Sequence, residues 1–249
     1  MATTKNTSDA RGAAVTGGAP SAYKAAARPQ GLSRRLAAVA EAVRPGASVA
    51  DVGCDHGKLA AFLVCSGKCP SAVASDINVE PLNKARALFN SLGIGERCRA
   101  VLRDGLDGAE PHEVDDVVIA GVGGDVIIRI LERAAWLRSA DVRLVLCPTT
   151  RRAKLRRWLY GEGFELTAER AVVEDGFCYT VMSVEYSGEK REITGGFAAI
   201  GLLTGGSDGE KAYRAREIKR AERLLRSGAD DDKKARAQNT LDYIREVDI

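Results

Sequence analysis

Short apolar runs alternate with longer amphipathic runs between about residues 31 and 186. Runs rich in Val, Ala and Ile predict buried strands, and apolar positions that recur every three or four residues predict helices. We expect strands at 48–53, 72–78, 98–105, 115–124 and 142–149, and helices near 31–43, 57–67, 80–92, 124–137 and 151–162. Strands this apolar, separated this regularly by helices, predict an α/β fold with a doubly wound parallel sheet.

The pattern changes twice after the last of these helices. Residues 164–186 contain two β-like runs on either side of Asp175-Gly176, which predicts an antiparallel pair at the edge of the sheet. A Gly-rich apolar patch at 195–206 then leads into two amphipathic stretches that predict a helical hairpin. We therefore divide the chain into a sheet domain (31–188) and a C-terminal helical module (189–249).

Residues 1–30 are rich in Ala, Gly, Ser and Thr and have no apolar periodicity, which predicts a disordered tail. Several basic residues with Asp9 as the one acid also fit a transit peptide, but no amphipathic face supports that alternative. No apolar run is long enough to predict a transmembrane helix. We expect a cytoplasmic protein of unknown oligomeric state.

Composition leaves the ligand open. The 249 residues are 45% hydrophobic, and 37 basic residues nearly balance 34 acidic ones, so only local clusters of charge can indicate a nucleic-acid partner. The six cysteines form no CxxC pair, and only His56 and His112 could join them as metal ligands. We therefore predict reduced core thiols and no metal site.

The motif "DVGCDHG" (51–57) follows the first predicted strand and opens a helix. Ligands of open α/β sheets bind beyond the carboxyl ends of the strands, at this kind of turn. The motif lacks the central glycine of a dinucleotide-binding turn and adds Asp51 and Asp55. Two like charges about 4 Å apart cost about 4 kcal/mol at an effective dielectric near 20. A cationic ligand without phosphate is therefore favoured, and S-adenosylmethionine fits that description.

Three further strand ends carry matching residues. Asp76 in "SDIN" (75–78) lies about 20 residues beyond the turn, where an acid can accept both ribose hydroxyls. Asp104 and Gly105 in "RDGL" (103–106) suit an adenine edge, and "IAGVGG" (119–124) closes the set. Helix caps and turns explain any one of these acids but not all four motifs in register.

These motifs, together with "LSRRL" (32–36), "LVLCPT" (144–149), "LRRWL" (155–159) and "EDGFCY" (174–179), resemble the TrmK family of bacterial tRNA (adenine-22, N1) methyltransferases. The resemblance covers nearly all of 31–249. It implies a class I methyltransferase, Rossmann-like sheet with a coiled-coil-like helical module, S-adenosylmethionine as cofactor and tRNA as partner. The chain departs from the family at Cys147-Pro148-Thr149, where Gln-Pro-Asn is usual, which affects the expected contacts to the target base. The expected cofactor contacts are Asp51, Gly53, Asp55, His56, Asp76, Ile77, Asp104, Gly105, Gly121 and Gly123.

N1 of adenine already carries a lone pair, so methyl transfer to it needs positioning but no general base. A carboxylate near the ring would stabilise the cationic product, and Asp51, Asp55 and Asp125 are the catalytic candidates. The turn "AGVGGD" (120–125) lacks the Asn/Asp-Pro-Pro-aromatic pattern typical of transfer to an exocyclic amino group. Cys147 could serve as the nucleophile of a pyrimidine methyltransferase, but a buried core cysteine is favoured because nothing nearby activates it.

Basic residues cluster where an RNA would meet the predicted mouth. We expect phosphate contacts from Arg34, Arg35, Arg151, Arg152, Lys154 and Arg156. The first C-terminal helix is also strongly basic, although a solvated helix face with Glu217 and Glu222 explains it equally well. Trp158 could stack on a base but fits an apolar helix face better. Two alternatives to tRNA methylation remain: a methyltransferase of another substrate, and a non-catalytic RNA-binding relative.

Overall fold

The computed structural model describes residues 31–110 and 112–247. The expected tail at 1–30 lies outside that range. The predicted parallel strands are β1 (Val49–Val52), β2 (Ala72–Asp76), β3 (Cys98–Leu102), β4 (Asp116–Ala120) and β5 (Arg143–Cys147). Each is shorter than predicted because the polar and glycine residues at its carboxyl end belong to the following loop. Two long strands complete the sheet, β6 (Phe164–Glu174) and β7 (Phe177–Tyr186).

The sheet has the order β3-β2-β1-β4-β5-β7-β6. The first five strands are parallel, and β7 runs antiparallel to both β5 and β6. The predicted fold class is therefore confirmed, including the antiparallel pair at the edge. The strand order reverses at β1, between β2 and β4, so the ligand-binding crevice of such a sheet lies at the carboxyl ends of these strands.

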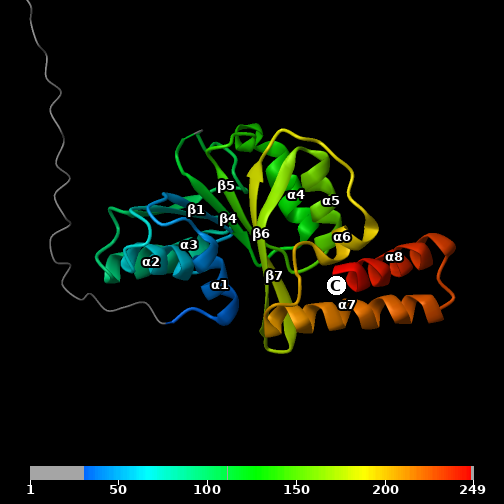
Figure 1. Cartoon of the computed structure of the whole chain (residues 1–249). Helices are drawn as coiled ribbons and strands as arrows, with labels where there is room; N and C mark the ends of the chain where they lie inside the picture. Colours follow the sequence, from blue (N-terminus) through cyan, green and yellow to red (C-terminus); the bar gives the residue numbers. More distant parts are fainter. Residues whose placement is uncertain (1–30, 111, 248–249) are drawn as a thin grey trace, which may run out of the picture.

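Helices cover both faces of the sheet (Figure 1). They are α1 (Arg34–Ala42), α2 (Lys58–Cys65), α3 (Val79–Ser91), α4 (Gly124–Arg133) and α5 (Arg152–Gly161). One hydrophobic core joins α1, α2 and α3 to residues such as Val118 and Val145, and a second joins α4 and α5 to their neighbours Val117 and Leu144. Successive residues of β4 and β5 thus point into opposite cores, which explains why these strands read as continuous apolar runs.

The C-terminal module contains α6 (Gly195–Ile200), α7 (Asp208–Arg226) and α8 (Asp231–Val247). The helical hairpin of α7 and α8 is confirmed, whereas α6 falls in the Gly-rich patch for which no helix was predicted. Gly196 allows this short helix to pack against α8, because a Cβ atom there would collide with Tyr243 of α8. The module shares a small core with the hairpin of β6 and β7, through Ala171, Cys178 and Tyr213 among others.

The β6–β7 hairpin extends past the carboxyl ends of the parallel strands. Pairing between β5 and β7 runs from Arg143 opposite Glu185 to Leu146 opposite Met182, but β6 and β7 stay paired as far as Glu174 and Phe177. The projecting end lies between α1 and α7 (Figure 1). It therefore forms one wall of the edge at which the crevice opens.

Candidate functional site

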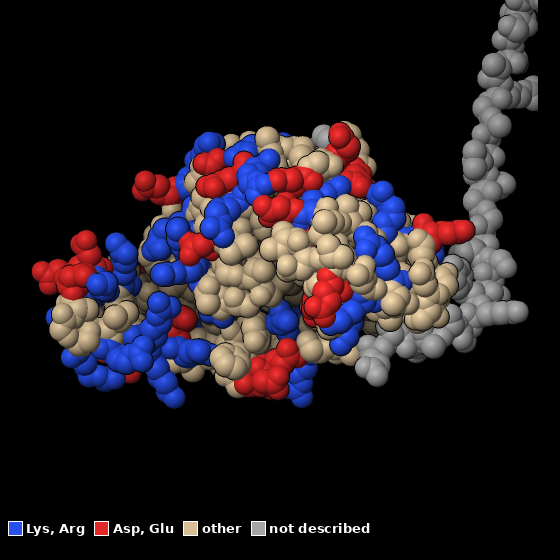
Figure 2. Space-filling view, turned by 180° about the vertical axis from the view of Figure 1, so that it is seen from behind, with Lys and Arg blue, Asp and Glu red and all other residues tan. Residues whose placement is uncertain are grey.

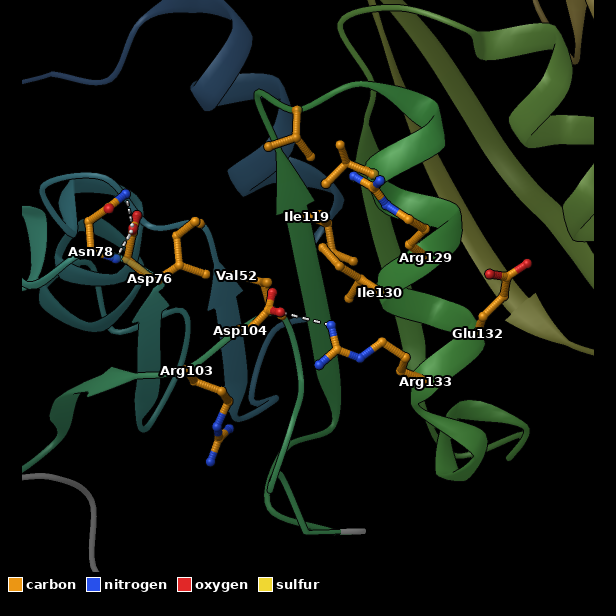
Figure 3. A pocket seen from close by; sticks show the side chains of 15 residues that line it. Val52, Asp76, Asn78, Arg103, Asp104, Ile119, Arg129, Ile130, Glu132 and Arg133 are labelled. Carbon is orange, nitrogen blue, oxygen red and sulfur yellow. Dashed lines mark hydrogen bonds and ion pairs between the residues drawn. The ribbon is translucent and has the colours of Figure 1, made fainter.

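A cavity of about 560 Å³ opens at the carboxyl ends of β1, β2 and β3 and against α4 (Figure 3). Five of the residues predicted to hold the cofactor line it: Gly53, Asp76, Ile77, Asp104 and Gly105. Asp51, Asp55, His56, Gly121 and Gly123 are not among its lining residues, although Val122 between the two glycines is. The register of β1, β2 and β3 brings the first group together, because all three strands end at one edge.

The loop after β2 places one carboxylate and one apolar side chain at the cavity. Oδ1 of Asp76 accepts hydrogen bonds from the backbone N (2.9 Å) and Nδ2 (3.3 Å) of Asn78. Asn78 immediately precedes α3, but its side chain bonds to Asp76 and does not cap the helix. Ile77 is 64% exposed beside this carboxylate. A fixed acid next to an exposed aliphatic side chain suits a ribose joined to a flat heterocycle.

Helix α4 supplies the wall that sequence reasoning missed. Val126, Arg129, Ile130, Glu132 and Arg133 line the cavity from this helix. Nη1 of Arg133 donates to Oδ2 of Asp104 at 2.8 Å, across the opening (Figure 3). Gly105 lies so close to Ile130 that a Cβ atom would stand 3.0 Å from its side chain. The amphipathic pattern of α4 predicted its buried face, but nothing in the sequence shows that the loop after β3 packs against it.

Asp51 is buried in β1 between β2 and β4 and is 4% exposed. Its Oδ2 atom has no hydrogen-bond partner among the described residues. The pKa of this carboxyl is raised to about 7, mainly by burial and further by the charges of Asp55 and Asp76, while a backbone hydrogen bond from Ala60 opposes the rise. A buried carboxylate oxygen without a hydrogen-bond partner is costly, so a cation beside Oδ2 would stabilise this group.

The turn between β1 and α2 ends at Gly57, which adopts a left-handed backbone conformation with φ +67°. A Cβ atom at this position would lie 2.7 Å from the Phe89 ring and 2.8 Å from Cβ of Ala85, so only glycine permits this approach of α3. Asp55 also has a positive φ of 51°, and its carboxylate lies 3.4 Å from Nε2 of His56. The side chain of Asp55 is 76% exposed, which leaves it accessible at the end of the strand.

The third catalytic candidate, Asp125, is engaged with cations. Its Oδ1 accepts a hydrogen bond from Nζ of Lys154 at 2.7 Å, and its Oδ2 lies 3.6 Å from Nε of Arg151. The hydrogen bond from Lys154 holds the pKa of Asp125 below its usual value. This carboxylate therefore orients two of the predicted RNA-binding side chains.

A second cavity, of about 530 Å³, lies between α5 and the C-terminal helices. We call it the basic groove. Seven cationic residues line it, with Glu217 as its acid: Arg151, Arg152, Lys154, Arg157, Arg220, Lys233 and Arg236. Figure 2 shows Lys and Arg gathered over the end of the molecule formed by α7 and α8. Lys233 and Arg236 were missed, because the run of aspartates before them masks their shared helix face.

The prediction that Arg156 contacts RNA is wrong. Arg156 is 0% exposed, and its Nη2 forms an ion pair of 2.5 Å with Oε1 of Glu169 on β6. Its Nη1 donates to the carbonyls of Ala198 (2.7 Å) and Ala199 (3.0 Å) in α6. Burial alone would lower the pKa of Arg156, but the Glu169 carboxylate and Tyr213 together outweigh it and raise that pKa. Arg156 thus joins the C-terminal module to the sheet domain.

The other residues predicted to bind RNA differ in how far their side chains are exposed to solvent. Arg34, Arg151 and Lys154 are exposed. Arg152 is partly buried, because Nη2 donates to the carbonyl of Cys178 at 2.6 Å and its guanidinium lies 5.6 Å from the Tyr213 ring centroid. Arg35 is held by Glu174 and lies over Tyr179. Only the exposed members of the set can approach a phosphate without rearrangement.

Cys147 and Trp158, for which the sequence also allowed a role as nucleophile and as stacking residue, both belong to the core. Cys147 is 0% exposed, and burial raises the pKa of its thiol to about 11 while Arg35 partly opposes this. Trp158 is partly buried and stacks on Phe164, with ring centroids 6.0 Å apart. Both placements confirm the core assignment favoured from the sequence.

Within residues 31–110 and 112–247, no cluster of three or more His, Cys, Asp and Glu side chains could hold a metal ion. In the same part of the chain, no helix combines the length and the apolar character needed to cross a bilayer.

Comparison with known proteins places this geometry among methyltransferases. The family described as "Methyltransferase domain" matches residues 32–182. The tRNA (adenine(22)-N(1))-methyltransferase of Bacillus subtilis is 34% identical over 174 residues, which cover 70% of this chain and 73% of the relative. Streptococcus pneumoniae Sp1610 in complex with S-adenosyl-L-methionine superposes with a TM-score of 0.73 at 32% identity, covering 87% of this chain and 99% of the other. Mycoplasma capricolum TrmK in complex with S-adenosyl-homocysteine gives 0.72 at 25% identity, covering 87% and 98%.

Proposed function

Because the chain belongs to the TrmK family of tRNA (adenine(22)-N(1))-methyltransferases, we propose that it transfers a methyl group from S-adenosylmethionine to N1 of adenine-22 in tRNA. The observation that carries this proposal is the pairing of two sites. The carboxyl ends of β1, β2 and β3 surround a cavity of nucleoside size, and a groove with seven cations lies between α5 and the C-terminal helices.

The residues of the cavity fit S-adenosylmethionine. Asp76 would accept hydrogen bonds from the ribose hydroxyls, and Ile77 and Ile130 would contact the adenine faces. The orphaned Oδ2 of Asp51 suits a cationic group of the methionine part, since a positive charge would offset the burial of this carboxylate. Asp104 would accept from the adenine amino group, provided that its oxygen atoms are shared with Arg133.

When bound, S-adenosylmethionine supplies an electrophilic methyl group. The residues of this chain then have to hold the target base so that N1 faces that group, and to exclude water from the crevice. Of the three candidate aspartates, Asp55 is the one with an exposed carboxylate free of arginine and lysine partners among the described residues. We assign it the role of stabilising the positive charge that develops on the adenine ring.

The basic groove would hold the tRNA backbone. Its cations are spread over α5, α7 and α8, so a folded polyanion of some length could touch several of them at once. Such contacts set affinity and orientation, whereas the crevice chooses the base. An enzyme acting on a small molecule would have no need of this surface.

The test is nucleoside mass spectrometry on tRNA incubated with the protein and S-adenosylmethionine. N1-methyladenosine should appear, and it should disappear when adenine-22 is replaced by uracil in a synthetic tRNA. Methylation of another base would contradict the assignment of N1. Binding of tRNA without any methylation would support the non-catalytic alternative.

A further inference from the structure

A second group of polar and aromatic side chains lies beside the cofactor cavity, where α1 begins and the β6–β7 hairpin projects. Arg35 stands in the first turn of α1, while Glu174, Phe177 and Tyr179 belong to the tip of the hairpin. The proposed function uses none of the last three. Their elements lie far apart in sequence but contact each other at the edge where the crevice opens.

Arg35 and Glu174 face each other without saturating their hydrogen bonds. The backbone N of Arg35 donates to Oε1 of Glu174 at 3.2 Å, which fixes the carboxylate. Nε of Arg35 and Oε2 of Glu174 are 3.9 Å apart, too far for a hydrogen bond. The two side chains are 23% and 17% exposed, so they present a donor beside an acceptor in partly dry surroundings.

One loop separates this pair from the cofactor cavity. Val122 lines the cavity, and the preceding residue, Gly121, adopts φ +86° and donates its N–H to the carbonyl of Cys147 at 3.2 Å. A Cβ atom on Gly121 would lie 3.3 Å from Nη1 of Arg35. The guanidinium of Arg35 therefore lies directly against the loop whose next residue, Val122, lines the cofactor cavity.

The hairpin adds aromatic faces to this position. The guanidinium of Arg35 lies 5.2 Å from the Tyr179 ring centroid, and the Tyr179 and Phe177 rings are 6.4 Å apart. Phe177 is 58% exposed at the turn, although a large aromatic side chain is normally buried. Proteins that bind an extruded RNA base commonly stack it on such an exposed ring.

We propose that Arg35 and Glu174 select the target base by reading the Hoogsteen edge of adenine, with Phe177 stacked against the extruded base; the inference rests on the proposed function. Arg35 donates to N7, and Glu174 accepts from the N6 amino group. N1 is left without a protein partner and faces the methyl donor. Guanine presents O6 in place of the amino group, and an oxygen acceptor opposite the carboxylate of Glu174 is repelled.

The test replaces one atom of the substrate. A tRNA carrying 7-deazaadenine at position 22 lacks the N7 acceptor but keeps the amino group and the lone pair on N1. We expect the wild-type protein to methylate it about tenfold less efficiently in kcat/KM than the unmodified tRNA, since one hydrogen bond to a charged donor is lost. Arg35→Ala should methylate both tRNAs slowly and at nearly equal rates.

The ratio of the two rates separates recognition from a structural role. If Arg35 only braces α1 against the hairpin, Arg35→Ala lowers both rates and preserves the tenfold ratio. Arg138→Ala is the matched control, because it removes an ion pair of 2.8 Å with Glu162 elsewhere in the fold and should keep the ratio. Equal wild-type rates on the two tRNAs would overturn the inference alone, whereas no methylation of unmodified adenine-22 would overturn the proposed function too.

Discussion

The cofactor cavity and the basic groove have nearly the same volume, about 560 and 530 Å³, but the charges that line them differ. Three acids and three arginines line the cavity: Asp76, Asp104, Glu132, Arg103, Arg129 and Arg133. In the groove, seven cations face one glutamate. The first site suits a small ligand that carries both charges and whose chemical groups each contact a particular side chain. The second suits a polyanion held by its backbone.

The two sites also differ in how the fold builds them. The cavity arises from strand ends within one sheet, whose register the backbone hydrogen bonds impose. The groove exists only where α5 meets the appended helices, and the ion pair of Arg156 with Glu169 lies at that junction. Cofactor binding should therefore survive substitutions that loosen the C-terminal helical module, whereas RNA binding should not.

The largest expected effect comes from Arg156→Ala. Removing the arginine leaves Glu169 buried without its cation, which costs about 3–5 kcal/mol of stability. Thermal unfolding followed by fluorescence should show a lower midpoint, and tRNA affinity should fall with it. Calorimetry should still detect S-adenosylmethionine binding at a temperature where the sheet domain is folded. Loss of tRNA binding with an unchanged unfolding midpoint would instead indicate that Arg156 contacts the RNA directly.

This residue also shows where sequence reasoning ends. Strands and helices followed from apolar periodicity, and five of the ten residues predicted at strand ends line the cavity. The role of Arg156 depends on Glu169, which lies on β6 and also accepts a hydrogen bond from the backbone N of Leu202, just after α6. None of that packing is visible in the sequence. The α4 wall of the cavity was missed for the same reason. Asp51 could be singled out as a candidate because its motif is local in sequence.

Charge reversal in the groove should have the next largest effect. We expect Arg220→Glu with Arg236→Glu to weaken tRNA binding at least about 100-fold and to flatten its dependence on salt, since two phosphate contacts become repulsions. Lys219→Glu with Arg223→Glu is the matched control, because these residues share the two helical turns of Arg220 but do not line the groove. Equal losses in the two double variants, measured by filter binding, would mean that net charge and not the groove holds the tRNA.

Asp76→Ala tests the cofactor cavity in place of the basic groove. Losing the hydrogen bonds to the ribose should cost about 1.5–3 kcal/mol of S-adenosylmethionine binding, measured by calorimetry. Binding of tRNA should stay close to wild type, because Asp76 lies in the cavity and not in the groove. Wild-type affinity for the cofactor would show that the ribose is held elsewhere.

The affinity of the cavity for S-adenosylmethionine should depend on pH through the carboxyl of Asp51. The pKa of Asp51 is about 7 in the folded protein, against an ordinary value of 3.8. A cationic ligand favours the ionised form, so its affinity should rise about fivefold between pH 6 and pH 7 and about tenfold between pH 6 and pH 8, and level off above pH 8. Asp51→Asn should abolish this rise and weaken binding. A flat profile for the wild-type protein would separate Asp51 from the ligand.

The same raised pKa has the opposite consequence for the protein without its cofactor. The folded state keeps the proton on Asp51 between about pH 4 and pH 7, whereas the unfolded chain releases it. The contribution of this group to stability is therefore complete below the ordinary pKa and is lost as the pH rises toward 7. Denaturant unfolding at pH 5 and pH 8 should show Asp51→Asn gaining stability over wild type mainly at the higher pH.

The smallest effect is expected for Cys147→Ser. Cys147 ends β5, is fully buried, and its thiol has a pKa of about 11, so almost none of it is the reactive thiolate at neutral pH. Transfer to a ring nitrogen that already carries a lone pair requires no thiol, and the hydroxyl of serine occupies a similar volume. Methylation should therefore fall less than about threefold in kcat, with a modest loss of stability from burying a hydroxyl. Complete loss of activity in a folded variant that still binds S-adenosylmethionine would indicate covalent catalysis on a pyrimidine. The cavity and the groove would then serve a different base from the one proposed.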